Sequence, residues 1–214
     1  MNIVDIKYGS TAGAGGDNQD KILCEQLSED TFVAILADGI GGLEHGDLAA
    51  ETVVRSIYNT VKAILPLIDI PQALSVAFDK ADKAIEEQSR NLRCKMGAAV
   101  SVVIVASDSV HCAWQGNVRL YYQKADRWCL LTEDHVKSSD SSTLLTRCVN
   151  GKGFRYPIST LSATSANVSS LLLCTDGFYL SDSCMQLVQK GEISSSHLDP
   201  QQDDASYILL ELKR

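Results

Sequence analysis

TFVAILADGIGG, residues 31–42, joins an apolar run to an aspartate and a glycine-rich turn. The residues before Asp38 are apolar and β-branched, a composition typical of a buried β-strand. Asp38-Gly39 ends this run, and the glycines that follow predict a turn. The stretch therefore predicts a buried strand that delivers a carboxylate to the edge of a sheet.

A long helical region follows, and a series of strands comes after it. The apolar residues of 49–64 and of 74–85 recur every three or four positions, which predicts two amphipathic helices. Strands are predicted at 98–106, 110–114 and 169–175, a hairpin at 119–132, a polar loop at 138–142 and a final strand at 205–212. This order favours an α+β domain in which antiparallel sheets pack together under helices, rather than a doubly wound parallel fold.

Composition narrows the class of protein. The 214 residues suit a single domain, and the net charge of −8 lacks the basic footprint of a nucleic-acid-binding protein. No apolar run is long enough to span a bilayer, and MNIVDIKYGS does not resemble a signal peptide. Seven cysteines without CxxC spacing predict reduced thiols in a cytoplasmic protein and argue against a zinc site.

Acidic residues stand at the end of four apolar runs. Asp38 follows TFVAILA, Asp176 follows LLLCT, Asp203-Asp204 precede ASYILLEL, and Asp20 precedes Ile22-Leu23. Carboxylates that meet in one poorly solvated cleft need protons or cations, and hard oxygen ligands favour Mg²⁺ or Mn²⁺. Asp-Gly is also a common turn dipeptide, so at any single position a solvated turn is the simpler interpretation.

Seven motifs in order resemble the PPM family, the type 2C protein phosphatases, in a short bacterial form. They cover residues 18–206 and read NQD (18–20), ADGIGGLEHGDLAA (37–50), GNVRLYY (116–122), LTEDH (131–135), LTRCVNG (145–151), LLLCTDG (171–177) and DDAS (203–206). The resemblance implies one domain over residues 1–214, folded as an αββα sandwich of two antiparallel sheets flanked by helices.

The resemblance also implies a binuclear Mn²⁺ or Mg²⁺ centre and a metal-bound water nucleophile that hydrolyses phosphoserine or phosphothreonine on proteins. Asp38 would bridge both ions, Asp176 and Asp203 would complete one site, and Asp20 with the Gly39 carbonyl would hold the other. Asp204 is the alternative to Asp203. The implied partners are a phosphorylated protein substrate and an opposing Ser/Thr kinase, with no nucleic acid and no membrane.

Three departures from the family pattern bear on activity. Gly15 stands where the family usually has a phosphate-binding arginine, and Lys7, Lys21 or the backbone amides of 13–16 are candidate substitutes. Asn117 and Leu180 replace two carboxylates of a third metal site, which predicts that this site is absent or weak. The short connection after His135 predicts a shortened flap. A pseudophosphatase or phosphoprotein-binding module with weak or no catalysis is the alternative function.

Overall fold

The computed structural model describes residues 2–125, 127–139, 142–165, 168–194, 198 and 203–213. Its strands form two five-stranded antiparallel sheets and a separate hairpin. One sheet has the order β1 (Asn2–Thr11), β12 (Ala205–Lys213), β11 (Ser170–Cys174), β6 (Arg119–Lys124), β7 (Arg127–Leu130). The other has the order β10 (Ser159–Thr164), β5 (Ser109–Gln115), β4 (Ala98–Ala106), β3 (Thr31–Gly39), β2 (Asp20–Ser28). The hairpin pairs β8 (Val136–Ser139) with β9 (Ser142–Leu145).

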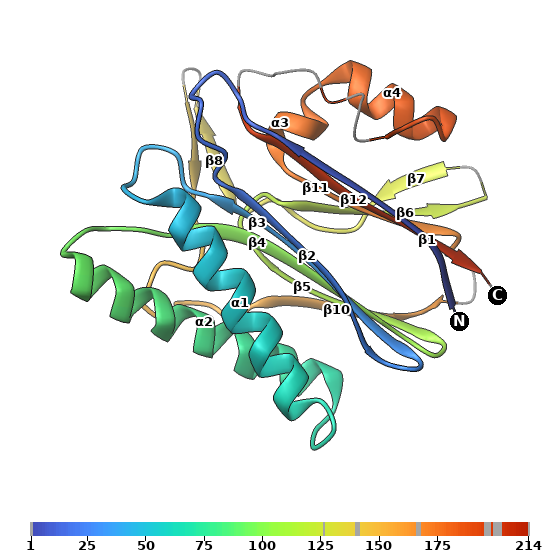
Figure 1. The fold of residues 1–214 in the computed structure, drawn as a ribbon, viewed down its shortest axis with the longest axis horizontal. Helices are drawn as coiled ribbons and strands as arrows, with labels where there is room; N and C mark the ends of the chain where they lie inside the picture. Colours follow the sequence, from blue (N-terminus) through green and yellow to red (C-terminus); the bar gives the residue numbers. More distant parts are fainter. Residues whose placement is uncertain are drawn as a thin grey trace.

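The two sheets face each other, and helices cover their outer faces (Figure 1). The long helices α1 (Gly46–Ile64) and α2 (Ile70–Leu92) lie on the sheet that contains β3, whereas α3 (Asp176–Tyr179) and α4 (Asp182–Lys190) lie on the sheet that contains β12. The architecture is therefore the expected αββα sandwich, and the α+β fold class is confirmed.

Alternation along the central strands explains why they read as continuous apolar runs. Successive side chains of a strand point to opposite faces of its sheet. In β3, Val33 and Ile35 pack in the core under α1 and α2, whereas Ala34 and Leu36 pack in the core between the two sheets. Each face of such a strand is buried, so apolar residues dominate on both faces.

Capping residues define both ends of the long helix α2. In α2, the Asp69 carboxylate accepts a hydrogen bond of 2.8 Å from the backbone N–H of Gln72, which caps the N-terminus. The helix ends at Arg93, which adopts a left-handed conformation. Helices α1 and α2 both bury an apolar face in one core, so their ends hold fixed positions relative to each other.

Several details differ from the sequence-based expectation. The polar loop expected at 138–142 is wrong, because Ser138, Ser139 and Ser142 belong to the β8–β9 hairpin, while residues 140 and 141 lie outside the described part. The turn interpretation of Asp-Gly is wrong for both Asp38-Gly39 and Asp176-Gly177. Gly39 ends strand β3 and Gly177 lies in helix α3.

Candidate metal centre

A cleft of about 560 Å³ opens where strand ends of both sheets meet. One wall comes from Asp38, Gly39 and the turn that follows them. The opposite wall carries Asn117, Asp176 and the Asp203-Asp204 pair. The β8–β9 hairpin contributes Val136, Leu144 and Leu145 to the rim, and Gln19, Cys148 and Asn150 complete the lining.

Asp20 and Asp38 lie directly opposite each other in the register of β2 and β3. Asp38 lines the cleft, whereas Asp20 is only 4% exposed and is not among the lining residues. Thr175 Oγ1 donates a hydrogen bond of 2.9 Å to Asp20 Oδ2. The other oxygen, Oδ1, is buried and finds no partner among the described residues. Asp20 therefore sits behind the cleft with one oxygen left to bind something else.

Asp176 is held by two donors at the start of α3. The Asn117 amide donates to Oδ2 at 3.0 Å, and the backbone N–H of Gly177 donates to Oδ1 at 2.9 Å. Asn117 was expected to weaken a third metal site. In this structure it also orients Asp176, a contact that sequence reasoning missed because it joins residues 59 positions apart.

The carboxylates of Asp203 and Asp204 contact different groups. The Asp204 carboxylate accepts hydrogen bonds from the backbone N–H groups of Gly13 (2.8 Å) and Gln19 (2.7 Å), so both of its oxygens are engaged. Asp203 is exposed at the cleft, and among the described residues its Oδ1 accepts a hydrogen bond from the neighbouring N–H of Asp204. This arrangement favours Asp203 over Asp204 as the residue that offers oxygen to the cleft.

The clustered carboxylates perturb one another. Burial, reinforced by Asp204 and Asp176, raises the pKa of Asp20 to about 7 despite hydrogen bonds from Ser206 and Thr175 that lower it. Burial also raises the pKa of Asp38 well above its usual range, with further contributions from the charges of Asp20, Asp176, Asp203 and Asp204. The pKa of Asp176 is raised as well, first by burial and then by Asp203. Without cations, part of this site must stay protonated.

These observations fit a site for hard divalent cations. The charged side chains that line the cleft are the carboxylates of Asp38, Asp176, Asp203 and Asp204, and carboxylate oxygen is a ligand that Mg²⁺ and Mn²⁺ prefer. The unpaired Oδ1 of buried Asp20 and the raised pKa values of Asp20 and Asp38 both indicate that these carboxylates need a proton or a cation to balance their charge. The structure brings Asp38, Asp176 and Asp203 to this cleft and places Asp20 opposite Asp38 in the neighbouring strand.

We expect the metal-free protein to lose stability as the pH rises from about 4 toward about 8. The folded chain keeps protons on carboxyls that the unfolded chain releases above the usual value of 3.8. This stabilisation is complete below that value and is lost as the pH rises through the folded pKa, which is about 7 for Asp20. For Asp20 alone the loss approaches ~4 kcal/mol.

Urea unfolding in EDTA at pH 5 and pH 8 measures this effect. Saturating Mn²⁺ should remove most of the pH dependence, because the cation replaces the protons. Asp20→Asn should flatten the metal-free profile, since the amide does not titrate. A metal-free protein whose stability is constant or rises between pH 5 and 8 would contradict the expectation.

The candidate substitutes for the missing arginine lie elsewhere. Lys7 pairs with Glu211 at 2.9 Å, and Lys21 donates to the backbone oxygens of Asn18 and Asp20. Neither lysine lines the cleft. Gly13 is needed for packing, because a side chain there would collide with the backbone of Asp203. At Gly15 a side chain would meet nothing within 4 Å.

A family model described as "Protein phosphatase 2C" matches residues 10–205. Among curated proteins, the "Serine/threonine phosphatase stp" of Listeria innocua is 28% identical over 167 residues, which cover 68% of this chain and 66% of that protein. The protein of the same name from Listeria monocytogenes matches with the same identity and coverage. The match thus spans slightly less than two thirds of the length of these relatives.

Solved structures resemble the whole fold. The serine/threonine phosphatase Stp1 from Staphylococcus aureus superimposes with a TM-score of 0.80 at 18% identity, covering 100% of this chain and 96% of that one. The serine/threonine phosphatase PstP/Ppp from Mycobacterium tuberculosis gives 0.78 at 17% identity and covers 100% of both chains. At this identity the likeness shows the shared sandwich.

Proposed function

Because the chain belongs to the protein phosphatase 2C family, we propose that it is a metal-dependent phosphatase acting on phosphoserine or phosphothreonine in proteins. The observation that carries this proposal is the convergence of Asp38, Asp176 and Asp203 on one cleft, with buried Asp20 behind them. The purified protein should hydrolyse a phosphothreonine peptide with Mn²⁺ or Mg²⁺, lose activity in EDTA and regain it on readdition. Absence of turnover with millimolar Mn²⁺ would contradict the proposal.

In the proposed centre, Asp38 would bridge two ions, Asp20 and the Gly39 carbonyl would hold one, and Asp176 and Asp203 the other. When bound, two such ions supply Lewis acidity that lowers the pKa of a water nucleophile and neutralises phosphate charge. Asn117 and the N–H of Gly177 orient the Asp176 carboxylate. The amides that bind Asp204 fix the start of β12, and this positions Asp203.

A basic cavity beside the cleft supports a peptide substrate. It has a volume of about 410 Å³, includes Arg147, Lys152 and Arg155, and shares Leu145, Cys148 and Asn150 with the cleft. Gln115, only 1% exposed, also lines this cavity, and neither polar atom of its amide has a partner among the described residues. We propose that acidic residues flanking the phosphorylated side chain bind here.

The remaining assignments concern the surroundings of the cleft. We propose that residues 1–214 form a single phosphatase domain whose shortened flap is the β8–β9 hairpin, since this hairpin borders the cleft. A third metal site should be absent or weak, because a neutral amide at Asn117 and an apolar side chain at Leu180 cannot replace two carboxylates on a hard cation. None of the helices in the described residues is long and apolar enough to cross a membrane. We propose a cytoplasmic protein that opposes a Ser/Thr kinase.

One observation favours a weaker or non-catalytic variant of this function. The phosphate-binding arginine of the family is replaced by Gly15, and no cationic side chain among the described residues lines the cleft itself. A pseudophosphatase would bind a phosphoprotein without turnover. The unobstructed space at Gly15 allows this alternative to be tested directly.

We expect Gly15→Arg to lower KM for a phosphopeptide by at least about tenfold, because a guanidinium forms charge-assisted bonds to phosphate. Gly15→Gln, of similar size but neutral, is the matched control and should leave KM near that of the parent. Steady-state kinetics with Mn²⁺ measures both. If the parent is inactive and Gly15→Arg is active, the scaffold is competent but lacks its clamp. If the parent and Gly15→Arg are both inactive and both bind phosphopeptide, the chain is a binding module.

A further inference from the structure

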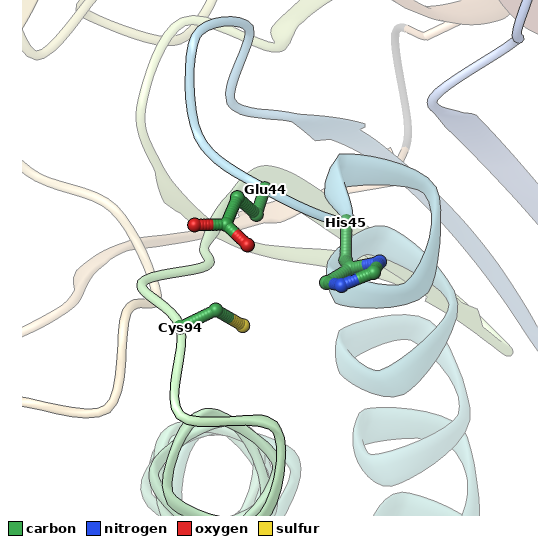
Figure 2. A group of neighbouring side chains, drawn as sticks. All are labelled: Glu44, His45 and Cys94. Carbon is green, nitrogen blue, oxygen red and sulfur yellow. The ribbon is translucent and has the colours of Figure 1, made fainter.

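Three side chains outside the aspartate cleft bring together the ligand types of a thiophilic metal. A Glu44 carboxylate oxygen, a His45 ring nitrogen and the Cys94 Sγ all lie within 4.8 Å of one another (Figure 2). Glu44 and His45 immediately precede α1, and Cys94 follows the end of α2. Residues almost 50 positions apart in the sequence thus form one compact cluster at the surface.

The backbone holds two of these residues in defined positions. His45 adopts a left-handed conformation (φ 55°, ψ 46°), and its side chain does not cap α1. Arg93, directly before Cys94, is also left-handed, and the N–H of Cys94 donates to the Ser89 carbonyl at 3.1 Å. A left-handed residue other than glycine costs on the order of 1 kcal/mol, so such residues are uncommon. Here they direct an imidazole and a thiol toward each other.

The ligand set selects the metal. Sulfur, nitrogen and oxygen donors together suit Zn²⁺, whereas Mg²⁺ and Mn²⁺ prefer oxygen alone. A thiolate and a carboxylate offset the two positive charges of the ion. The partial negative charge of the carbonyls at the C-terminal end of α2 also favours a cation there. It offsets the partial positive charge at the N-terminal end of α1, which disfavours one. Three protein ligands leave a fourth tetrahedral position for water.

We propose that Glu44, His45 and Cys94 form a zinc site separate from the aspartate cleft. The site differs from the expectation drawn from the missing CxxC spacing, because its thiol and imidazole come from two different helix ends. Residues 40–43 line the cleft and continue directly into Glu44. A bound ion therefore ties this wall of the cleft to the end of α2. The inference does not rest on the proposed phosphatase activity.

Cobalt substitution tests the proposal without an activity assay. Co²⁺ added to the protein in saturating Mg²⁺ should give a sulfur-to-metal charge-transfer band, which oxygen ligands cannot produce. Cys94→Ser should abolish the band, and Cys129→Ser, which alters another half-buried thiol, should leave it unchanged. His45→Asn, which retains a residue tolerant of the left-handed conformation, should weaken Zn²⁺ binding at least about tenfold by calorimetry.

Two results would overturn the proposal. One is that the parent protein gives no charge-transfer band. The Co²⁺ concentration for this measurement is one that saturates the aspartate cleft when no Mg²⁺ is present. The other is a band that persists in Cys94→Ser, which would assign the sulfur ligand to another cysteine. Circular dichroism of each variant shows whether it is folded, and zinc X-ray absorption of the parent should detect one sulfur ligand.

Discussion

Asp38→Asn should lower Mn²⁺-dependent hydrolysis of a phosphopeptide by at least about 10³-fold, or ~4 kcal/mol of transition-state stabilisation. Burial is the largest cause of the raised pKa of Asp38, and the charges of Asp20, its cross-strand partner, and of Asp176 and Asp203 raise it further. Removing this central carboxylate takes away the ligand proposed to bridge two ions. A neutral amide cannot replace its charge.

The same substitution should not destabilise the metal-free protein. Asparagine relieves the repulsion that Asp38 experiences, so urea unfolding in EDTA at pH 8 should give equal or greater stability than the parent. Asp79→Asn, which neutralises an exposed aspartate on α2, is the matched control and should change neither quantity. Activity within tenfold of the parent in a folded Asp38→Asn protein would refute the proposed centre.

Gly39→Ala should destabilise the fold by about 4 kcal/mol, a large effect for the addition of one methyl group. The added Cβ would overlap the backbone carbonyl of Gly46 at the start of α1. Backbone atoms of a packed helix cannot move aside as the end of a flexible side chain can. The strand end that carries Asp38 must therefore separate from α1, and affinity for Mn²⁺ should fall as well.

Gly41→Ala is the control for this effect. It lies two residues further along the chain, in the turn after β3, and a Cβ there would meet nothing within 4 Å. Urea denaturation of the two variants and the parent should show a lower midpoint for Gly39→Ala alone. Equal midpoints for both alanine variants would show that the close approach of β3 to α1 is not required.

The elements that could be predicted from the sequence are those with strong periodicity. The helices at 46–64 and 70–92 and the doubly buried strands β3, β4, β11 and β12 carry apolar patterns that few other structures satisfy. Strands β1, β2 and β10 and helix α4 were not predicted. β1, β2 and β10 lie at sheet edges, and the described parts of β2 and β10 are largely half-buried or exposed, which leaves a weak pattern.

The candidate centre could be predicted only in part. The identities of Asp20, Asp38, Asp176 and Asp203 follow from their places at strand ends and from the family motifs. Their relative positions depend on the register of β2 and β3 and on contacts such as Asn117 with Asp176, which no local pattern encodes. The division of tasks between Asp203 and Asp204 likewise depends on the distant amides of Gly13 and Gln19.

The bond between Asp204 and the N–H of Gly13 joins residues 191 positions apart, and β12 itself pairs with β1. A nascent chain that still lacks β12 has neither Asp203 nor an acceptor for these amides. Closing so large a loop is entropically costly, so we expect this contact to form late in folding. A folding intermediate in which β12 is not yet paired should therefore bind Mn²⁺ weakly, because Asp203 is not yet held at the cleft.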